Sequence, residues 1–234
     1  MCSRGYKSLY RIDLGRTNFK ETWDLQKKLV DLRVNDKIPD TILITEHEPV
    51  ITMGRGTSVK NLLVSREELA KRGVEVHQIE RGGDITYHGP GQIVVYPIID
   101  LDSRGRDLHA YLRDLEEVVI KTLKEYDLNA ATKRGMTGVW VDNHKLAAIG
   151  VAVRRWVSYH GLALNITTDL SYAELINPCG ITQFPVGSIT SMMGKDADFD
   201  EVKNLLAENF VDYFNYEVKK ATSVDQMISE LKVA

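Results

Sequence analysis

The sequence predicts an α/β domain of the α+β type, in which helices flank mixed β-sheets. Its 234 residues suffice for one large domain, and no repeat, linker or low-complexity tract marks a boundary, so we expect a single domain over residues 1–234. Helical and strand-like patterns follow one another without the regular alternation of a doubly wound fold. Three strand-like segments also come in succession, and the letters DNHK between the first two indicate a hairpin turn.

Five segments carry helical signals. They are residues 18–36, 65–73, 107–128, 198–216 and 223–233. The first places Phe19 and Trp23 near one face, and the third repeats its apolar residues at helical spacing. The second begins with Ser65 and Glu68 at the spacing of a capping box and stops at Gly73, a residue typical of helix ends.

Six segments read as strands. They are residues 41–47, 74–80, 91–100, 137–142, 145–153 and 157–166. The segment 91–100 is apolar on both faces, which predicts a central place in the sheet. Pro97 within it argues against that place, because proline cannot donate to a strand ladder.

Composition excludes several classes of protein. The net charge of -3 disfavours a nucleic-acid binder. No apolar run approaches the roughly 18 residues of a membrane helix. The first residues lack the apolar core of a signal peptide, so we expect a cytoplasmic protein. The two cysteines, Cys2 and Cys179, cannot form a disulfide scaffold or a four-thiolate zinc site.

The glycine-rich stretch RGGDITYHGPG, residues 81–91, stands directly before a predicted strand. It is neither a P-loop nor a dinucleotide fingerprint, because no Lys-Ser or Lys-Thr follows the glycines and no helix begins there. Gly82 and Gly83 allow backbone to approach a ligand closely, whereas a hairpin with an incidental His88 is the structural alternative.

Three further stretches are candidates for chemistry. NPCG holds Cys179 in a turn, where it is accessible for reaction, although a small buried side chain is the commoner fate of a free cysteine. HKLAAIG opens an apolar strand with Lys145, which is either partly desolvated or simply exposed at a turn. YHGLALN places His160 and Asn165 on a strand of small residues, and a satisfied core histidine is the alternative for the first.

Other catalytic centres find no support in the sequence. The six histidines are scattered, and neither the H-E-x-x-H motif nor a cysteine pair at zinc spacing occurs, so we expect no metal. The letters GSITS do not match the G-x-S-x-G turn of a Ser-His-Asp hydrolase.

Together these stretches carry a resemblance. RGGDITYHGPGQIVVYPIIDL resembles the signature R-G-G-x-x-T-aromatic-H-x-x-G-Q-x-x-x-Y of the octanoyltransferase family, also called lipoyl(octanoyl) transferase or lipoate-protein ligase B. HKLAAIG, HGLALN and NPCGI follow in the family's order, and TEHEPVITMGR precedes them. The resemblance runs from about Trp23 to past Thr190, and it implies the mixed-sheet fold of the biotin- and lipoate-protein ligase catalytic domains.

The resemblance also implies an activity and a site. The activity is transfer of an octanoyl group from acyl carrier protein to a lysine of a lipoyl domain through an acyl-cysteine, the first step of endogenous lipoate biosynthesis, with no cofactor. Cys179 would be the nucleophile and Lys145 its partner. The residues implied to line the acyl site are Arg81, Gly82, Gly83, Asp84, Ile85, Thr86, Tyr87, His88, Ala148, Ile149, Gly150, Gly161, Leu162 and Ala163.

The implied partners are octanoyl-acyl carrier protein, the lipoyl domains of 2-oxoacid dehydrogenase subunits and the glycine cleavage H protein. Because such partners are acidic, we expect a basic surface near the site. Its candidate residues are Arg104, Arg106, Lys133, Arg134, Arg154 and Arg155. Two other functions stay open: an ATP-dependent lipoate or biotin ligase of the same fold, and a binding module for acyl groups that performs no reaction.

Overall fold

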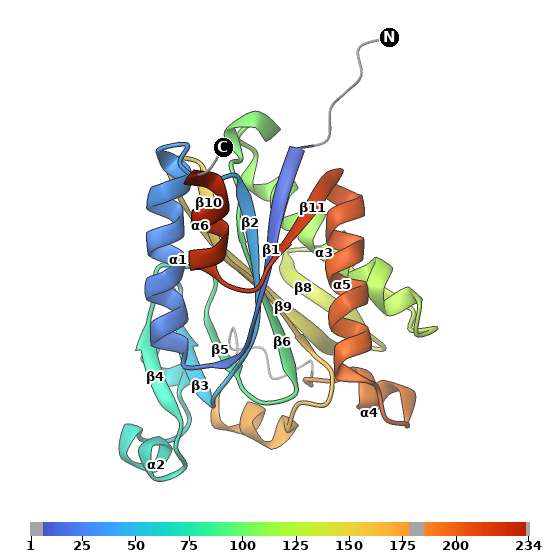
Figure 1. The fold of residues 1–234 in the computed structure, drawn as a ribbon. Coiled ribbons are helices and arrows are strands. Elements are labelled where there is room, and N and C mark those ends of the chain that lie inside the picture. The colour runs from blue at the N-terminus through green and yellow to red at the C-terminus, as the bar shows by residue number, and fades with distance from the viewer. Residues whose placement is uncertain (1–6, 178–184, 233–234) are drawn as a thin grey trace.

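The computed structural model describes residues 7–177 and 185–232. Its centre is a mixed sheet of eight strands in the order β11-β1-β2-β6-β10-β9-β8-β7 (Figure 1). The strands are β1 (Lys7–Thr17), β2 (Asp40–His47), β6 (Gln92–Ile98), β7 (Ala130–Lys133), β8 (Met136–Val141), β9 (His144–Arg154), β10 (Val157–Asn165) and β11 (Tyr216–Ala221). The β1 strand runs parallel to β2 and β11, and every other neighbouring pair is antiparallel.

A second sheet of three strands stands beside the first. Its order is β4-β3-β5, and its strands are β3 (Val50–Met53), β4 (Glu75–Gln78) and β5 (Ile85–His88). The turn at residues 89–91 leads from β5 directly into β6 of the large sheet. The glycine-rich stretch of the sequence therefore connects the two sheets.

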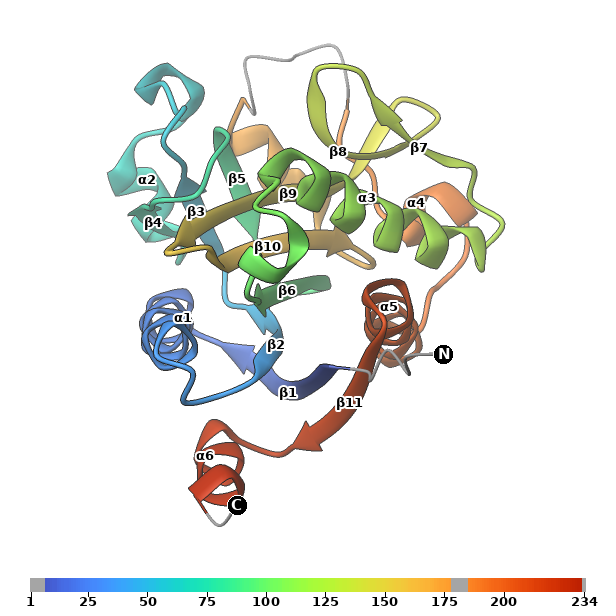
Figure 2. The same cartoon turned by 90° about the horizontal axis from the view of Figure 1, so that it is seen from above.

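Helices cover both faces of the large sheet, as Figure 2 shows from above. The helices are α1 (Phe19–Val34), α2 (Arg66–Lys71), α3 (Leu108–Lys124), α4 (Ile189–Met193), α5 (Phe199–Phe214) and α6 (Val224–Lys232). Short 3₁₀ turns are η1 (Val59–Asn61), η2 (Asp102–Arg104) and η3 (Leu170–Leu175). Helices α3 and α5 pack on one face, and α1 and α6 pack on the other.

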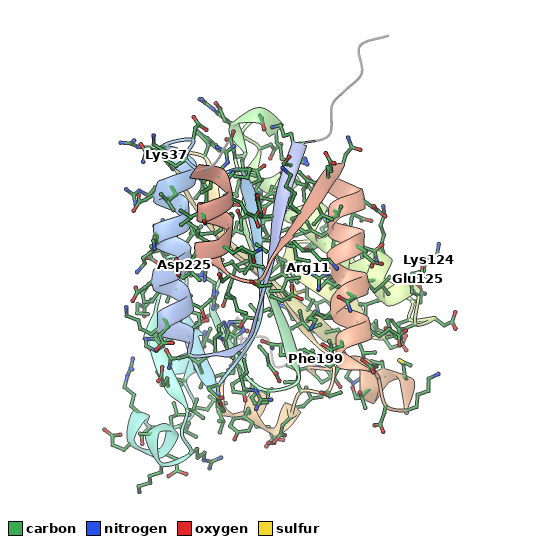
Figure 3. All side chains as sticks on the ribbon, viewed as in Figure 1. Arg11, Lys37, Lys124, Glu125, Phe199 and Asp225 are labelled. Atoms are coloured by element: carbon green, nitrogen blue, oxygen red, sulfur yellow. The ribbon has the colours of Figure 1, made fainter. Side chains whose placement is uncertain are left out.

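The alternation of side chains along the strands produces two separate cores. On β6, Ile93 and Val95 point to the core under α3 and α5, whereas Val94 and Tyr96 point to the core under α1. Figure 3 shows Arg11 midway along β1, where its guanidinium donates to Asn204 of α5 at 2.7 Å. The strand β6 is thus buried on both sides, as its continuous apolar run predicts.

Pro97 is compatible with the central position because the ladder between β10 and β6 stops before it. The ladder between β10 and β6 ends at the pair of Leu162 with Val95. At His160 the φ angle is +56°, and the backbone N–H of this residue donates to the side chain of Gln26 on α1 instead of to β6. The bend in β10 removes the need for a donor at Pro97.

All five predicted helices and all six predicted strands are present, with ends that differ by a few residues. The side chain of Ser65 accepts from the N–H of Glu68, as the capping spacing predicts. The strands β1, β3, β5, β7 and β11 were not among the six predicted strands. Three of them are short, and the exposed middle of β11 lacks the apolar alternation that identifies a strand.

Candidate active site

A cavity of about 380 Å³ lies between the small sheet and the face of the large sheet made by β6, β10 and β9. At one end it is lined by residues that reach the surface, including Gly135, Asp169 and the partly exposed Lys145. At the other end it is lined by Phe19 and Tyr96, which are 2% and 3% exposed. The cavity is therefore a recess with one open and one closed end.

The segment 81–84 forms one wall of the cavity. The buried guanidinium of Arg81 donates to the carbonyl and the hydroxyl of Thr52, at 2.8 and 3.0 Å. Gly83 has a φ of +82°, in the region that favours glycine, and a Cβ on Gly54 would lie 2.5 Å from the Gly83 carbonyl oxygen. The glycines thus let two loops pack closely, and Arg81 fixes them to strand β3.

The floor of the cavity consists of small residues on two paired strands. Ala148 of β9 pairs with Ala163 of β10, and Gly150 pairs with Gly161. A Cβ on Gly150 would lie 3.0 Å from the carbonyl oxygen of Gly82, so this glycine permits the close approach of the wall to the floor. Small side chains on the floor leave the space that the cavity occupies.

The closed end contains buried rings held by hydrogen bonds. Nε2 of His47 lies 2.7 Å from the hydroxyl of Tyr96. Nδ1 of His88 lies 2.7 Å from Oε1 of Gln92. Burial lowers the pKa of His47 to about 4 and that of His88 to about 3. Both rings are therefore uncharged at neutral pH and add no positive charge to the closed end.

His160 reaches the same end from the bend in β10. Its Nε2 lies 3.6 Å from the Glu80 carboxylate, which is longer than a hydrogen bond, and it has no hydrogen-bond partner among the described residues. Burial lowers the pKa of His160, and the contact with Glu80 opposes that shift. His160 is therefore not a core histidine whose ring nitrogens are all hydrogen-bonded, which was the structural alternative.

Lys145 lies at the open end on β9. It pairs with Trp140 of β8, and its Nζ lies 5.2 Å from the centre of the indole ring, within the range of a cation–π contact. A Cβ on Gly138 would lie 2.7 Å from Cε of Lys145, so this glycine provides room for the lysine stem. The buried carboxylate of Glu116 accepts from the Gly138 N–H at 2.8 Å and holds that backbone in place.

Cys179 lies outside the described residues, but the chain on both sides of it is placed. On one side, the N–H of Asn177 donates to the carbonyl of Asn61 at 2.8 Å. On the other, the N–H of Lys145 donates to the carbonyl of Pro185 at 2.8 Å. The chain that follows the cysteine segment therefore pairs with the strand that carries Lys145.

A chain of side-chain amides crosses the floor of the cavity. Nε2 of Gln92 donates to Oδ1 of Asn165 at 2.8 Å, and Nδ2 of Asn165 donates to the carbonyl of Gly187 at 3.0 Å. Since Gln92 uses its amide nitrogen in this way, its Oε1 accepts from Nδ1 of His88, which fixes the tautomer of that ring. The chain links the closed end to the segment that pairs with Lys145.

Most of the residues implied by the resemblance line this cavity. They are Arg81, Gly83, Asp84, Ile85, Thr86, Tyr87, His88, Lys145, Ala148, Ile149, Gly150, Gly161, Leu162 and Ala163. Gly82 is not one of the lining residues and instead donates its N–H to the carbonyl of Val151 at 3.0 Å. Sequence reasoning missed Phe19, Ile79 and Trp140 as lining residues, because an apolar side chain on a helix or strand carries no signal that separates a cavity wall from a core.

Within residues 7–177 and 185–232, no group of three or more metal-binding side chains comes together. No helix in the described part of the chain is long and apolar enough to cross a membrane.

Comparison with known proteins shows which family this chain resembles. The model of the lipoyl protein ligase A/B catalytic domain matches residues 18–211. An octanoyltransferase of Desulforamulus reducens is 42% identical over 210 residues, covering 89% of this chain and 92% of that protein. An octanoyltransferase of Koribacter versatilis is 44% identical over 222 residues, covering 93% of this chain and 88% of that protein.

Solved structures show the same fold at low identity. A bipartite lipoate protein ligase from Thermoplasma acidophilum, described with its E2 lipoyl domain, has a TM-score of 0.75 and 19% identity and covers 97% of this chain and 91% of its own. A lipoate-protein ligase A bound with ATP has a TM-score of 0.70 and 16% identity and covers 98% of this chain and 94% of its own. The extent and identity of the sequence matches show that the chain belongs to the octanoyltransferase family and is an acyltransferase of the lipoyl ligase fold.

Proposed function

We propose that this chain transfers an octanoyl group from the thioester of acyl carrier protein to a lysine ε-amine of a lipoyl domain, with Cys179 as the covalent carrier. The observation that carries the proposal is the position of Lys145 at the open end of a mostly apolar recess. The backbone of the same residue pairs with Pro185, which follows the cysteine segment. A cation and an acyl-sized recess thus lie beside Pro185, the first described residue after the cysteine.

The proposed reaction has two balanced steps. In the first, the Cys179 thiolate attacks the thioester carbonyl, the carbonyl–sulfur bond to the carrier breaks, and the carrier's thiolate takes up a proton. In the second, the target amine attacks the acyl-cysteine, the amide forms, and the Cys179 sulfur leaves. The attacking amine loses a proton, and neutral Lys145 is the group we assign to receive it. A thioester is more reactive than an amide, so no ATP is required.

Lys145 has a second role in the proposal. A free thiol with a pKa near 8.5 is only a few per cent ionised at pH 7. A neighbouring ammonium favours the thiolate and lowers the thiol pKa by about 1–3 units. Since the lysine must be charged to stabilise the thiolate and neutral to accept a proton, the two groups titrate as a pair.

The same site suggests where the acyl chain lies. We assign it to the recess between the 81–88 segment and the floor of Ala148 and Ala163. Burial of about six methylenes there contributes roughly 5 kcal/mol of gross transfer free energy. We also assign the chain to the cytoplasm, because the mechanism requires a reduced thiol.

Intact mass spectrometry tests the covalent route. Incubation with octanoyl-acyl carrier protein in the absence of ATP should add one octanoyl group to the chain, and a lipoyl domain added afterwards should remove it. The Cys179→Ser variant should not transfer octanoate at the normal rate. An absolute need for ATP would identify a ligase instead, and octanoate binding without an adduct or transfer would identify a binding module.

A further inference from the structure

The closed end of the cavity has an apolar wall made by three elements. Phe19 begins helix α1, Ile79 follows strand β4, and Val94 lies on β6, and they are 2%, 5% and 1% exposed. All three line the cavity. Phe19 and Ile79 also belong to one small core cluster with Val50. The wall is therefore buried in the protein and does not open to solvent.

The ring of Phe19 is held on two sides by the buried histidines. It stacks on His88 with ring centres 6.3 Å apart and an angle of 6° between the planes. It meets the edge of His47 at 5.4 Å. Those two rings are in turn held by Tyr96 and Gln92 at 2.7 Å each. These contacts restrict the movement of the ring.

The wall suits the methyl end of a chain and does not suit a charged group. The depressed pKa values keep His47 and His88 neutral at the pH at which enzymes usually work. The Arg81 guanidinium donates hydrogen bonds to Thr52 and to the carbonyl of Gly82. A terminal methyl loses no hydrogen bond in such a place.

The dimensions agree with a short acyl chain. Single C–C bonds of about 1.5 Å at angles near 111° advance about 1.25 Å each, so eight carbons extend over about 9 Å. Neighbouring strands are about 4.8 Å apart, so the two steps from β9 across β10 to β6 also span about 10 Å. Ala148 of β9, Ala163 of β10 and Val94 of β6 are register partners, so the floor from Ala148 to Val94 has about this width.

We propose that Phe19 sets the length of the acyl chain that this enzyme accepts, because its ring closes the cavity against the terminal methyl of an eight-carbon group. The inference rests on the proposed function, since it requires the acyl chain to occupy this cavity. Removal of the ring extends the recess toward α1, where additional methylenes become buried.

The test measures transfer from hexanoyl-, octanoyl-, decanoyl- and dodecanoyl-acyl carrier protein to a lipoyl domain. The wild-type chain should prefer octanoyl. In Phe19→Ala, each newly buried methylene should favour the longer donor about fourfold. The kcat/KM ratio of dodecanoyl to octanoyl should accordingly rise by more than about tenfold, relative to the wild type. Phe19→Leu, which removes less volume, should shift the ratio in the same direction by a smaller factor.

A matched control removes a buried phenylalanine elsewhere. Phe210 of α5 is 1% exposed and belongs to the core on the opposite face of the sheet. Phe210→Ala should lower stability and leave the chain-length ratio unchanged. The ratio compares two donors on one preparation, so it does not depend on the folded fraction. If Phe19→Ala is too unstable to assay, Phe19→Leu provides the measurement.

The outcomes separate the two claims. If the Phe19 variants transfer octanoate with the wild-type chain-length profile, the inference about Phe19 is wrong and the proposed function stands. If the wild-type chain transfers no acyl group from any of the four donors, the proposed function fails and the inference fails with it.

Discussion

The side chain of Asn165 donates a 3.0 Å hydrogen bond to the carbonyl of Gly187, and the N–H of Gly187 donates a 3.0 Å hydrogen bond to the carbonyl of Lys145. An asparagine on the cavity floor therefore holds the segment against which the lysine is aligned. The same amide accepts from Gln92, so it is satisfied on both sides. This connection gives a physical reason for an asparagine in the HGLALN stretch.

Asn165→Ala should slow acyl transfer through the position of Lys145. The change leaves the Gly187 carbonyl without its partner and the Gln92 amide nitrogen with the Tyr87 carbonyl alone, which costs about 1–3 kcal/mol of stability. We expect kcat to fall with little change in KM, because the bond positions a group and does not touch the carrier protein. Asn209→Ala is the control, since Asn209 makes one side-chain bond to Thr122 on the opposite face. Equal kcat values in both variants would contradict a positioning role.

Lys145→Ala should raise the pKa of the Cys179 thiol, because removal of an ammonium destabilises the thiolate. The rate of iodoacetamide alkylation near neutral pH should fall, and its pH profile should move to higher pH by about 1–3 units. Lys124→Ala is the control, since Lys124 is exposed at the end of α3 (Figure 3) and is not among the residues that line the cavity. A profile that does not move in Lys145→Ala would assign the activation of Cys179 to another group, such as His160 or His88.

The protein should lose stability in acid because of its buried histidines. Burial lowers the pKa of His47 from 6.5 to about 4 and that of His88 from 6.5 to about 3. The unfolded chain therefore binds more protons than the folded one between these values. The stabilisation is complete above about pH 6.5 and decreases as pH falls toward 3. For His47 alone it amounts to about 3 kcal/mol at ~1.4 kcal/mol per pKa unit.

Urea unfolding at a series of pH values measures this dependence. His47→Gln should unfold at lower urea concentration at pH 7 and show a weaker decline between pH 6.5 and 4. His109→Gln, at an exposed position on α3, should reproduce the wild-type profile. An identical acid decline in His47→Gln and the wild type would exclude His47 as its source.

Arg134 should contribute to the recognition of acidic partners. It is exposed in the β7–β8 hairpin, next to Gly135, which lines the open end of the cavity. Arg134→Glu should raise the KM for acyl carrier protein several-fold at low salt and less at high salt, because screening weakens exposed charges. Arg154→Glu serves as the control, since Arg154 already forms an ion pair with Asp31 at 2.7 Å. A KM that is unchanged at low salt in Arg134→Glu would remove that residue from the docking surface.

Two other candidates for a basic surface already interact with side chains of this protein. Arg106 pairs with Asp102, and the guanidinium of Arg104 lies 4.4 Å from the ring of Phe214. Charge along the sequence does not reveal such local pairing. The hairpin beside the cavity is therefore the place where we expect the partner-facing charge.

Some features of the site followed from the sequence because they depend on local chemistry. The glycine-rich stretch predicts a turn and a close approach of backbone, and Gly83 and Gly91 have positive φ angles of 82° and 81°. Continuous apolar character predicts a buried central strand, and β6 is such a strand. The motif order of the octanoyltransferase family identified Lys145, Ala148 and Ala163, which line one cavity.

Other features depend on the direction of a side chain, which no local pattern specifies. Ala148 and Gly161 are both small residues of the cavity lining, but a Cβ on Gly161 would lie 2.2 Å from the carbonyl oxygen of Val95. Gly161→Leu would therefore disturb the contact with β6, whereas Ala148→Leu is the sharper test of the recess. The bend at His160 also depends on residues far apart in the chain, since its N–H donates to the side chain of Gln26 on α1.

The sequence by itself determined the fold class, the family and the residue types of the site, because periodicity, turn chemistry and motif order are properties of neighbouring residues. The tertiary structure alone decided that Phe19 lines the cavity, that Asn165 holds the segment paired with Lys145, and that the buried histidines are neutral. Each of these results joins residues far apart in the chain. Their distances and burial are set by the packing of two sheets and a helix. The sequence of a single segment does not specify that packing.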